Sequence, residues 1–144
     1  MADEDLPADA GEDAAAGNGS ALGDYAKRIS RACPVEIVEA RNAVATLKRL
    51  DANRAAASVL LDAGGKVYDS DAFAKWLGEQ RDRGIREVIF VCGDADGFPE
   101  NLRERVKQKL SLSAMTYSHE LARVMLAEQI YRAFAILSGS PYPK

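Results

Sequence analysis

The apolar positions along the chain follow two periods, one typical of buried strands and one typical of helices. Short apolar runs at 58–62 and 87–92 predict two strands buried on both faces, because parallel strands covered by helices read as continuous hydrophobic stretches. Leu110–Leu112 predicts a further short strand, and Val35–Val38 alternates as a strand with one exposed face does. Gly64 and Gly65 are expected to end the 58–62 strand.

Segments with helical periodicity separate these strands. Asp69 or Ser70 can cap the helix that Gly84 ends, and Pro99 suits the first turn of the next helix. The predicted helices run from about Ala21 to before Pro34, over 43–57, over about 70–83, over about 99–109 and over 119–138. Strands alternating with helices predict an α/β fold, with a parallel sheet covered by helices on both faces.

The first 20 residues consist largely of Ala, Asp, Glu and Gly and contain almost nothing to bury. We expect residues 1–20 to be a disordered tail that folding does not require, and residues 21–144 to form a single domain. The acidic start lacks the basic and apolar regions of a signal peptide, and no apolar stretch approaches the ~20 residues of a membrane span. A cytoplasmic protein with no membrane partner is therefore predicted.

The charge is divided unevenly along the chain. The formal net charge is −3, but seven of the 22 acidic residues precede Tyr25, which leaves 15 acids against 19 bases in the rest. This mildly basic body permits a polyanionic partner, although an ordinary solvated surface explains it as well. His119 is the one histidine, so a histidine-rich metal site is not expected.

Two segments carry candidate chemistry. The glycines of Gly93–Gly97 follow a buried strand, where ligands bind in parallel α/β sheets, although a plain strand-to-helix turn explains them too. The segment has neither the GxGxxG spacing of a dinucleotide site nor a P-loop lysine. Further on, Ser118 can cap a helix on which His119 and Arg123 lie one turn apart. Such a pair suits a phosphate or a base edge, or is simply a surface pair.

The helix predicted over 119–138 has apolar residues on most of its faces. A helix that is apolar on most faces is buried on most faces, and a chain of 144 residues has few other elements to cover it. We therefore predict a homodimer that buries this helix at the subunit interface.

Three stretches carry a resemblance to a known family: LSLSAMTYSHELARVMLAEQIYRAF, VIFVCGDADG and the closing SPYPK. Together they resemble the bacterial 23S rRNA pseudouridine-N3 methyltransferase family of the SPOUT knotted methyltransferases. The resemblance covers about residues 22–144 and is densest over 87–142. It implies a C-terminal deep trefoil knot, S-adenosyl-L-methionine as cofactor, and methylation of N3 of a pseudouridine in helix 69 of large-subunit rRNA.

The resemblance also assigns residues. It implies cofactor binding by Leu61, Gly93, Leu112, Ser113, Ala114, Met115, Thr116 and Tyr117. It places His119, Arg123 and Tyr142 on the RNA side as candidate catalytic residues, with His119 the only imidazole that can act as a base. Arg123, Arg132 and Lys144 are the candidate contacts to the RNA backbone, whether on free ribosomal RNA or on the ribosome.

The chain departs from the family pattern at three places. The acidic tail replaces an N-terminal apolar strand, Asp94 replaces a second glycine, and Pro143 replaces a histidine near the end. The first departure predicts a sheet that lacks one strand. These departures motivate an alternative from another class, a non-catalytic RNA- or ribosome-binding protein on a decayed methyltransferase scaffold.

Overall fold

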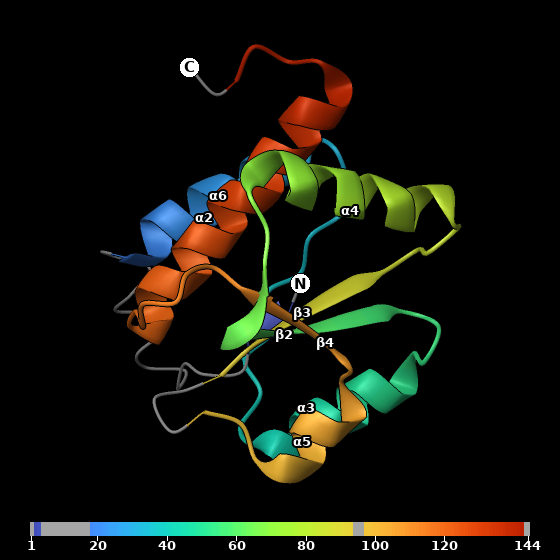
Figure 1. Ribbon diagram of the computed structural model, residues 1–144, viewed down its shortest axis with the longest axis vertical. Helices are drawn as coiled ribbons and strands as arrows, with labels where there is room; N and C mark the ends of the chain where they lie inside the picture. Colours follow the sequence, from blue (N-terminus) through green and yellow to red (C-terminus); the bar gives the residue numbers. More distant parts are fainter. Residues whose placement is uncertain (1, 4–17, 94–96, 143–144) are drawn as a thin grey trace.

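The computed structural model describes residues 2–3, 18–93 and 97–142, and side chains from Ala21 onward within these ranges (Figure 1). Its sheet has four parallel strands in the order β1-β3-β2-β4. The strands are β1 (Ala2–Asp3), β2 (Ala57–Val67), β3 (Val88–Cys92) and β4 (Gln108–Ser111). The helices are α2 (Asn18–Ile29), α3 (Ala43–Ala52), α4 (Ser70–Asp82), α5 (Glu100–Arg105) and α6 (His119–Ser138).

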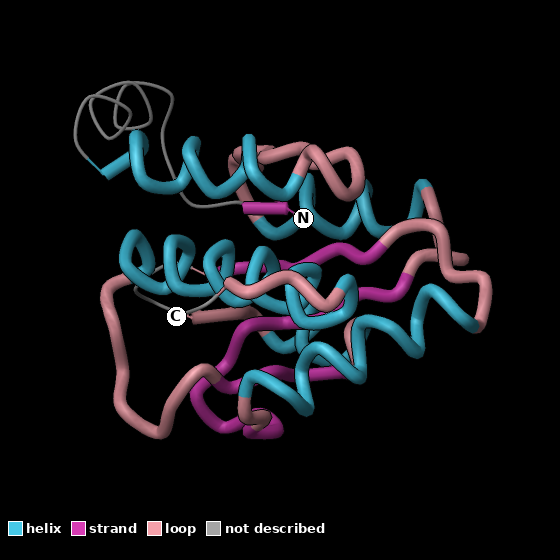
Figure 2. Tube along the Cα trace, turned by 90° about the horizontal axis from the view of Figure 1, so that it is seen from above, coloured by secondary structure: helices cyan, strands magenta, loops and turns pink. Residues whose placement is uncertain are grey.

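Helices cover both faces of the sheet, which confirms the predicted fold class. Alternate strand residues face opposite layers, so Val59 and Phe90 pack in one core and Leu60 and Val91 in the other. The first core lies under α2, α4 and α6, and the second lies over α3 and α5. Figures 1 and 2 show this division, with α6 lying between α2 and α4.

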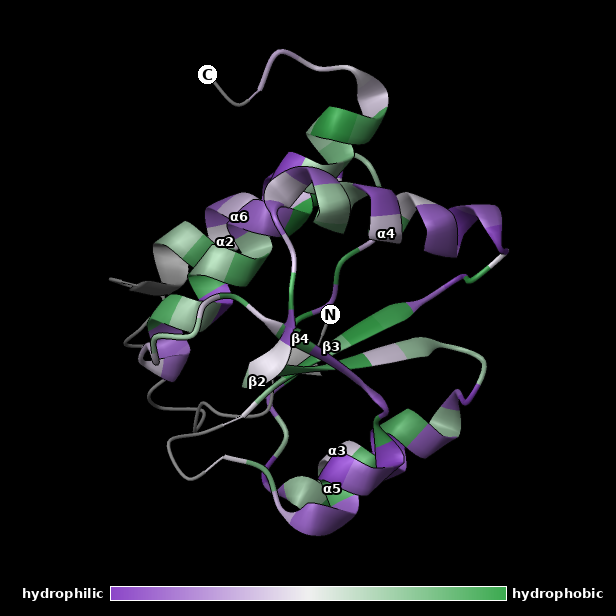
Figure 3. Cartoon of the chain, in the orientation of Figure 1, coloured by the Kyte–Doolittle hydropathy of each residue, from purple (hydrophilic) through white to green (hydrophobic). Residues whose placement is uncertain are grey.

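Side-chain caps and glycines define several helix ends. The Asp69 carboxylate accepts a hydrogen bond from the Ala72 amide at 2.7 Å, and α4 gives way to Gly84, whose φ is +80°. The Ser118 hydroxyl accepts from the Leu121 amide at 3.2 Å, and Gly139, with φ of +75°, ends α6. These ends agree closely with the predicted ones because capping depends on local sequence. Figure 3 shows the apolar residues concentrated on β2, β3 and the inner faces of the helices.

Three predicted elements differ from the structure. Val35–Val38 forms no strand, because this segment does not pair with the sheet, although Val35 packs against the first core. The helix predicted over 43–57 ends at Ala52, since Ala57 already belongs to β2. The helix predicted to start at Pro99 ends at Arg105, and β4 begins at Gln108.

The glycines at 64 and 65 interrupt β2 without ending it. Leu61 and Lys66 both pair with Leu110, so residues 62–65 bulge out of the ladder between β2 and β4. The expectation that these glycines stop the strand is wrong, because the strand resumes its pairing after the bulge.

The sheet also contains a strand near the N-terminus that the sequence did not predict. Ala2 pairs with Val91 and Asp3 with Cys92, so β1 lies on the outer edge of β3. The expected disorder of residues 1–20 therefore does not hold for these two residues or for the start of α2 at Asn18, and 4–17 lie outside the described residues. The expectation that the sheet lacks a strand fails for the same reason. None of the described helices is long and apolar enough to cross a membrane.

Candidate functional site at the carboxyl edge of the sheet

The strand register brings the predicted cofactor segments together. Leu61 on β2 pairs with Cys92 on β3 and with Leu110 on β4. Gly93 directly follows Cys92, and the 112–117 segment begins two residues after Leu110. Neighbouring strands lie about 4.8 Å apart, so these three segments meet at one place on the carboxyl edge of the sheet. Open parallel sheets bind their ligands at this edge.

The β2 bulge is fixed on both sides. Gly65 lies so close to β4 that a Cβ atom there would be 2.6 Å from the carbonyl carbon of Lys109, so only glycine fits. One oxygen of the Asp62 carboxylate accepts a hydrogen bond from the Gly64 amide at 3.4 Å, and the other accepts one from the Arg103 guanidinium at 2.8 Å. The bulge beside Leu61 is therefore held between α5 and β4.

The structural role of Gly93 differs from the one that its position after a buried strand predicts. A Cβ atom at Gly93 would lie 2.8 Å from Cζ of Phe98, so the space beside it is filled by that ring. The glycine with a positive φ in this segment is Gly97, at +79°. Gly93 is therefore required for a close side-chain contact, and the conformational role belongs to Gly97.

The loop after β4 presents apolar side chains to solvent. The Ser113 hydroxyl accepts a hydrogen bond from the Met115 amide at 3.0 Å. The backbone carbonyl of Ser113 accepts one from the Ser111 hydroxyl at 2.9 Å. These bonds hold the loop while Met115 remains 71% exposed and Tyr117 39% exposed. Ordered backbone beside uncovered apolar side chains suits the adenine ring of S-adenosylmethionine, which needs both hydrogen bonds and flat apolar contact.

The start of α6 lies next to this loop. His119 is half-buried, whereas the Arg123 side chain is buried, with 4% of the residue exposed. His119 and Arg123 are therefore more buried than a pair of side chains on an open surface would be. Because its guanidinium is buried, Arg123 does not reach a phosphate in this arrangement of the chain.

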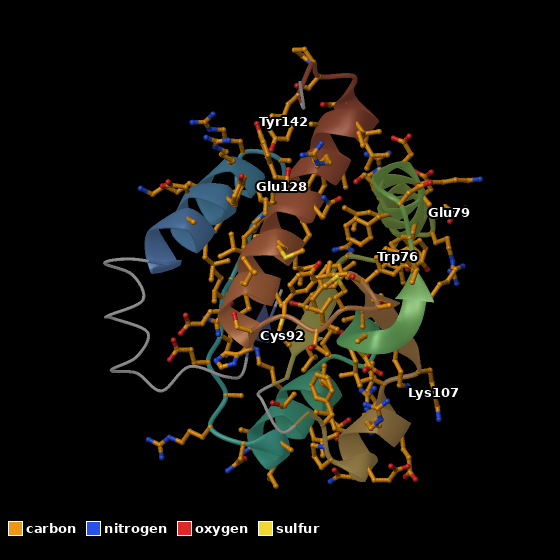
Figure 4. All side chains as sticks on the ribbon, turned by 60° about the vertical axis from the view of Figure 1, so that its left-hand side comes forward. Trp76, Glu79, Cys92, Lys107, Glu128 and Tyr142 are labelled. Carbon is orange, nitrogen blue, oxygen red and sulfur yellow. The ribbon has the colours of Figure 1, made fainter. Side chains whose placement is uncertain are left out.

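The third catalytic candidate, Tyr142, lies elsewhere. Its hydroxyl donates to Oε2 of Glu128 at 2.7 Å. Figure 4 labels both side chains on the C-terminal part of the chain. Burial, followed by the Glu128 hydrogen bond, raises the pKa of Tyr142 to about 12. Glu128 lies nine positions after His119 on α6, which is about 13.5 Å along the axis. One chain therefore does not bring His119 and Tyr142 to the same site.

Arg132, a candidate RNA contact near Tyr142, already has hydrogen-bond partners within the protein. Arg132 donates to Oε2 of Glu128 at 2.6 and 3.0 Å, and its guanidinium lies 5.4 Å from the centre of the Tyr142 ring. The hydrogen bond to Glu128 raises the pKa of Arg132. Arg132 thus serves to hold the C-terminal segment on α6, and Lys144 lies outside the described residues.

A cavity of about 520 Å³ opens beside these segments, between α2, α4 and α6. Of the residues predicted to bind the cofactor, only Leu112 lines it. Sequence reasoning missed the other side chains around it, although Glu128 and Gln129 are conspicuous as polar residues in an apolar helix. The walls of the cavity include Tyr25, Tyr68, Asp69, Ser70, Phe73, Glu128 and Gln129. No group of acidic, His and Cys side chains among the described residues is arranged to hold a metal ion.

Comparison with known proteins identifies the family. A family model described as "Predicted SPOUT methyltransferase" matches residues 10–143. A protein of Pelobacter propionicus is 41% identical over 133 residues, covering 85% of this chain and 87% of its own length. A protein of Koribacter versatilis is 42% identical over 122 residues, covering 83% and 84% respectively. One of Gemmatimonas aurantiaca is 40% identical over 144 residues, covering 90% and 92% respectively.

All three relatives are named "Ribosomal RNA large subunit methyltransferase H". The similarity spans both the strands that form the carboxyl edge and helix α6. The parallel sheet, the convergence of its strand ends and the match over nearly the whole chain agree with one another, and the chain belongs to the SPOUT methyltransferase family.

Proposed function

We propose that this protein methylates large-subunit ribosomal RNA, with S-adenosylmethionine as methyl donor, and that the acceptor is N3 of a pseudouridine in helix 69. The names of the relatives support the RNA class, and the family resemblance supports the nucleotide. The observation that carries the proposal is the register that places Leu61 between Cys92 and Leu110. Because ribosomes are its substrate, the enzyme acts in the cytoplasm.

The cofactor site is formed by the three segments at the carboxyl edge. Backbone groups of residues 112–117 hydrogen-bond the adenine, and Leu61, Met115 and Tyr117 supply apolar contact to its faces. When bound, S-adenosylmethionine supplies an electrophilic methyl group on a sulfonium. The bulge at 62–65 and the loop at 112–117 are the segments that would hold the cofactor at this edge.

The protein's own contribution to the reaction is mostly positioning. The acceptor nitrogen must lose its proton and lie in line with the methyl, which is the kind of step that a rigid site accelerates by orientation. His119 starts α6 beside the 112–117 loop, and we infer that its imidazole takes that proton. Buried Arg123, one turn further along α6, holds the inner side of the same helix start as a positioning residue.

The separation of His119 from Tyr142 fits a homodimer. The predicted reason for a dimer changes, because α2 and α4 already cover much of α6, including Leu126, Ala127 and Ile130. Near the start of α6, exposed apolar side chains remain at Met115, Tyr117 and Leu121, which are 71%, 39% and 48% exposed. A partner subunit that covers this surface brings a second chain next to the cofactor segments, and with it a second C-terminal segment.

Calorimetry with S-adenosylmethionine and a methyl-transfer assay on ribosomes test the proposal. We expect the purified protein to bind the cofactor and to methylate ribosomes from cells that lack its gene. His119→Ala is expected to retain cofactor binding and to lose methyl transfer, because His119 acts on the acceptor and not on the cofactor. A protein that binds ribosomes but not the cofactor would instead be a non-catalytic binding protein on a methyltransferase scaffold.

A further inference from the structure

The cavity between α2, α4 and α6 has no role in the cofactor site described above. We propose that it receives a single unpaired base of the RNA substrate, next to the bound cofactor. The inference rests on the proposed function and goes beyond it by assigning the residues that hold the base. Leu112 connects the two sites, since it both lines the cavity and begins the cofactor loop.

The size and the walls of the cavity suit a base. Its volume of about 520 Å³ is within the ~300–1,000 Å³ range of small-molecule sites. Tyr25, Tyr68 and Phe73 contribute aromatic rings from α2 and from the start of α4. Phe73 lies edge-on to Tyr68 at 6.4 Å and Lys66 lies 4.9 Å from the Tyr68 ring, so Tyr68 is held in place. Unstacked bases bind to such aromatic side chains.

A chain of hydrogen bonds orients the polar wall. The Ser70 hydroxyl donates to Oε1 of Gln129 at 2.7 Å, and Nε2 of Gln129 donates to Oε1 of Glu128 at 3.0 Å. Tyr142 and Arg132 occupy the other oxygen of Glu128. Each amide nitrogen has two N–H groups and each carboxylate oxygen two lone pairs. Gln129 therefore retains a donor and Glu128 an acceptor side by side, which matches the adjacent acceptor and donor on the edge of a base.

The charge of the cavity favours a base over a phosphate. Asp69 and Glu128 are carboxylates, and among the described residues that line the cavity none is Lys or Arg. Arg132 already pairs the Glu128 charge, so a phosphate would meet the Asp69 carboxylate and no free cation among the described lining residues, whereas an uncharged base that donates N–H groups would find acceptors. The apolar surface suited to a second subunit lies instead at Met115, Tyr117 and Leu121, which do not line the cavity.

Variants of the aromatic and polar walls test this inference. Tyr68→Ala and Gln129→Leu are compared with Tyr68→Phe, which keeps the ring. Glu79→Leu, on the exposed side of α4 (Figure 4), is the matched control. The measurements are the KM for ribosomes and for S-adenosylmethionine, the dependence of ribosome binding on salt, thermal melting and sedimentation.

We expect Tyr68→Ala and Gln129→Leu to raise the KM for ribosomes about tenfold or more, as loss of base stacking or readout does, with the KM for the cofactor unchanged. Tyr68→Phe and Glu79→Leu should behave as wild type. The salt dependence of ribosome binding should not change, because no phosphate contact is removed. If Tyr68→Ala has a lowered melting temperature, Gln129→Leu still tests the inference.

Three results would overturn the inference while leaving the proposed function intact. Wild-type kinetics in both variants would mean that no base enters the cavity. A matching loss of cofactor affinity would assign the cavity to the cofactor, and dissociation of a dimer would assign it to the partner subunit. Failure of the wild-type protein to bind the cofactor or to methylate ribosomes is a separate outcome, which overturns the proposed function and this inference with it.

Discussion

At the scale of single residues, Glu128 gathers the C-terminal segment and the cavity wall around one carboxylate. Its two oxygens accept hydrogen bonds from Gln129, Arg132 and Tyr142. Hydrogen bonds to a charged group are stronger than neutral ones, so the segment after Gly139 is held firmly on α6. The sequence predicts α6 to be an apolar interface helix, yet it carries a polar network. Tyr142, from the segment after the helix, is one of the partners in this network.

This network predicts the ionisation of Tyr142. Its pKa of about 12 lies above the ordinary value of 10.0, so the folded state holds the proton more tightly than the unfolded state. The stabilising contribution is complete below pH 10 and is lost as the pH rises toward 12. An ultraviolet titration of the native protein should show one tyrosine ionising late, and Tyr142→Phe should remove that late step. A late step that persists in Tyr142→Phe would assign it to another tyrosine.

A second prediction for a single residue concerns Gly93. A valine at this position displaces the Phe98 ring, which packs against the second core, and shifts the backbone that the cofactor contacts. We expect Gly93→Val to abolish S-adenosylmethionine binding in calorimetry and to cost about 1–3 kcal/mol of stability through overpacking. Gly23→Ala, where a Cβ atom meets nothing within 4 Å, is the control. Wild-type cofactor affinity in Gly93→Val would place the cofactor elsewhere.

At the scale of elements, the β2 bulge is the feature on which the site depends most. It places Leu61 opposite the ends of β3 and β4, and its shape is set by Gly65 and by the Asp62–Arg103 ion pair. A bulge of this kind re-aims the strand without ending it. The path of the chain through residues 62–65 therefore determines how the cofactor segments face one another.

Removing the ion pair tests the role of the bulge. Arg103→Met should weaken S-adenosylmethionine binding about tenfold, because a hydrogen bond to a charged group that holds the bulge is lost. Arg105→Met, on the same helix, breaks a comparable ion pair with Asp51 that lies away from the bulge, and should leave cofactor binding unchanged. Equal loss in both variants would show that α5 as a whole matters, and not the bulge.

The elements also show what a sequence can and cannot predict. The strands around Leu60 and Val91 and the helix over 119–138 were predicted because their apolar periods and caps are local. The strand expected at Val35–Val38 is wrong, and the bulge at Gly64 was missed, because both depend on which partner strand is within reach. The cavity was missed for the same reason: its walls come from α2, α4 and α6, which are brought together only by folding.

At the scale of the whole molecule, two helical layers enclose a sheet whose carboxyl edge carries the site. The α2–α4–α6 layer forms most of the cavity wall, and the α3–α5 layer supports the bulge from the other side through Arg103. The trefoil knot that the family resemblance implies stays a prediction. If the proposed sites are correct, the two layers separate cofactor support from substrate contact.

Formation of a homodimer is a prediction about the whole molecule. We expect sedimentation at micromolar concentration to give about twice the mass of the 15.5 kDa chain, because an apolar surface at Met115, Tyr117 and Leu121 is uncovered in one subunit. Leu121→Lys should shift the equilibrium toward monomer, and Val44→Lys, at a still more exposed apolar residue on α3, should not. A wild-type protein that sediments only as a monomer would contradict the proposed homodimer.

The central claim is that this chain transfers a methyl group to large-subunit ribosomal RNA. Mass spectrometry of ribosomal RNA from cells with and without the gene tests it most directly. We expect one nucleotide of the large-subunit RNA, a pseudouridine in helix 69, to lack a single methyl group when the gene is absent. We also expect the purified protein to restore this methyl group when S-adenosylmethionine is added. Identical RNA modification in the two strains would contradict the account.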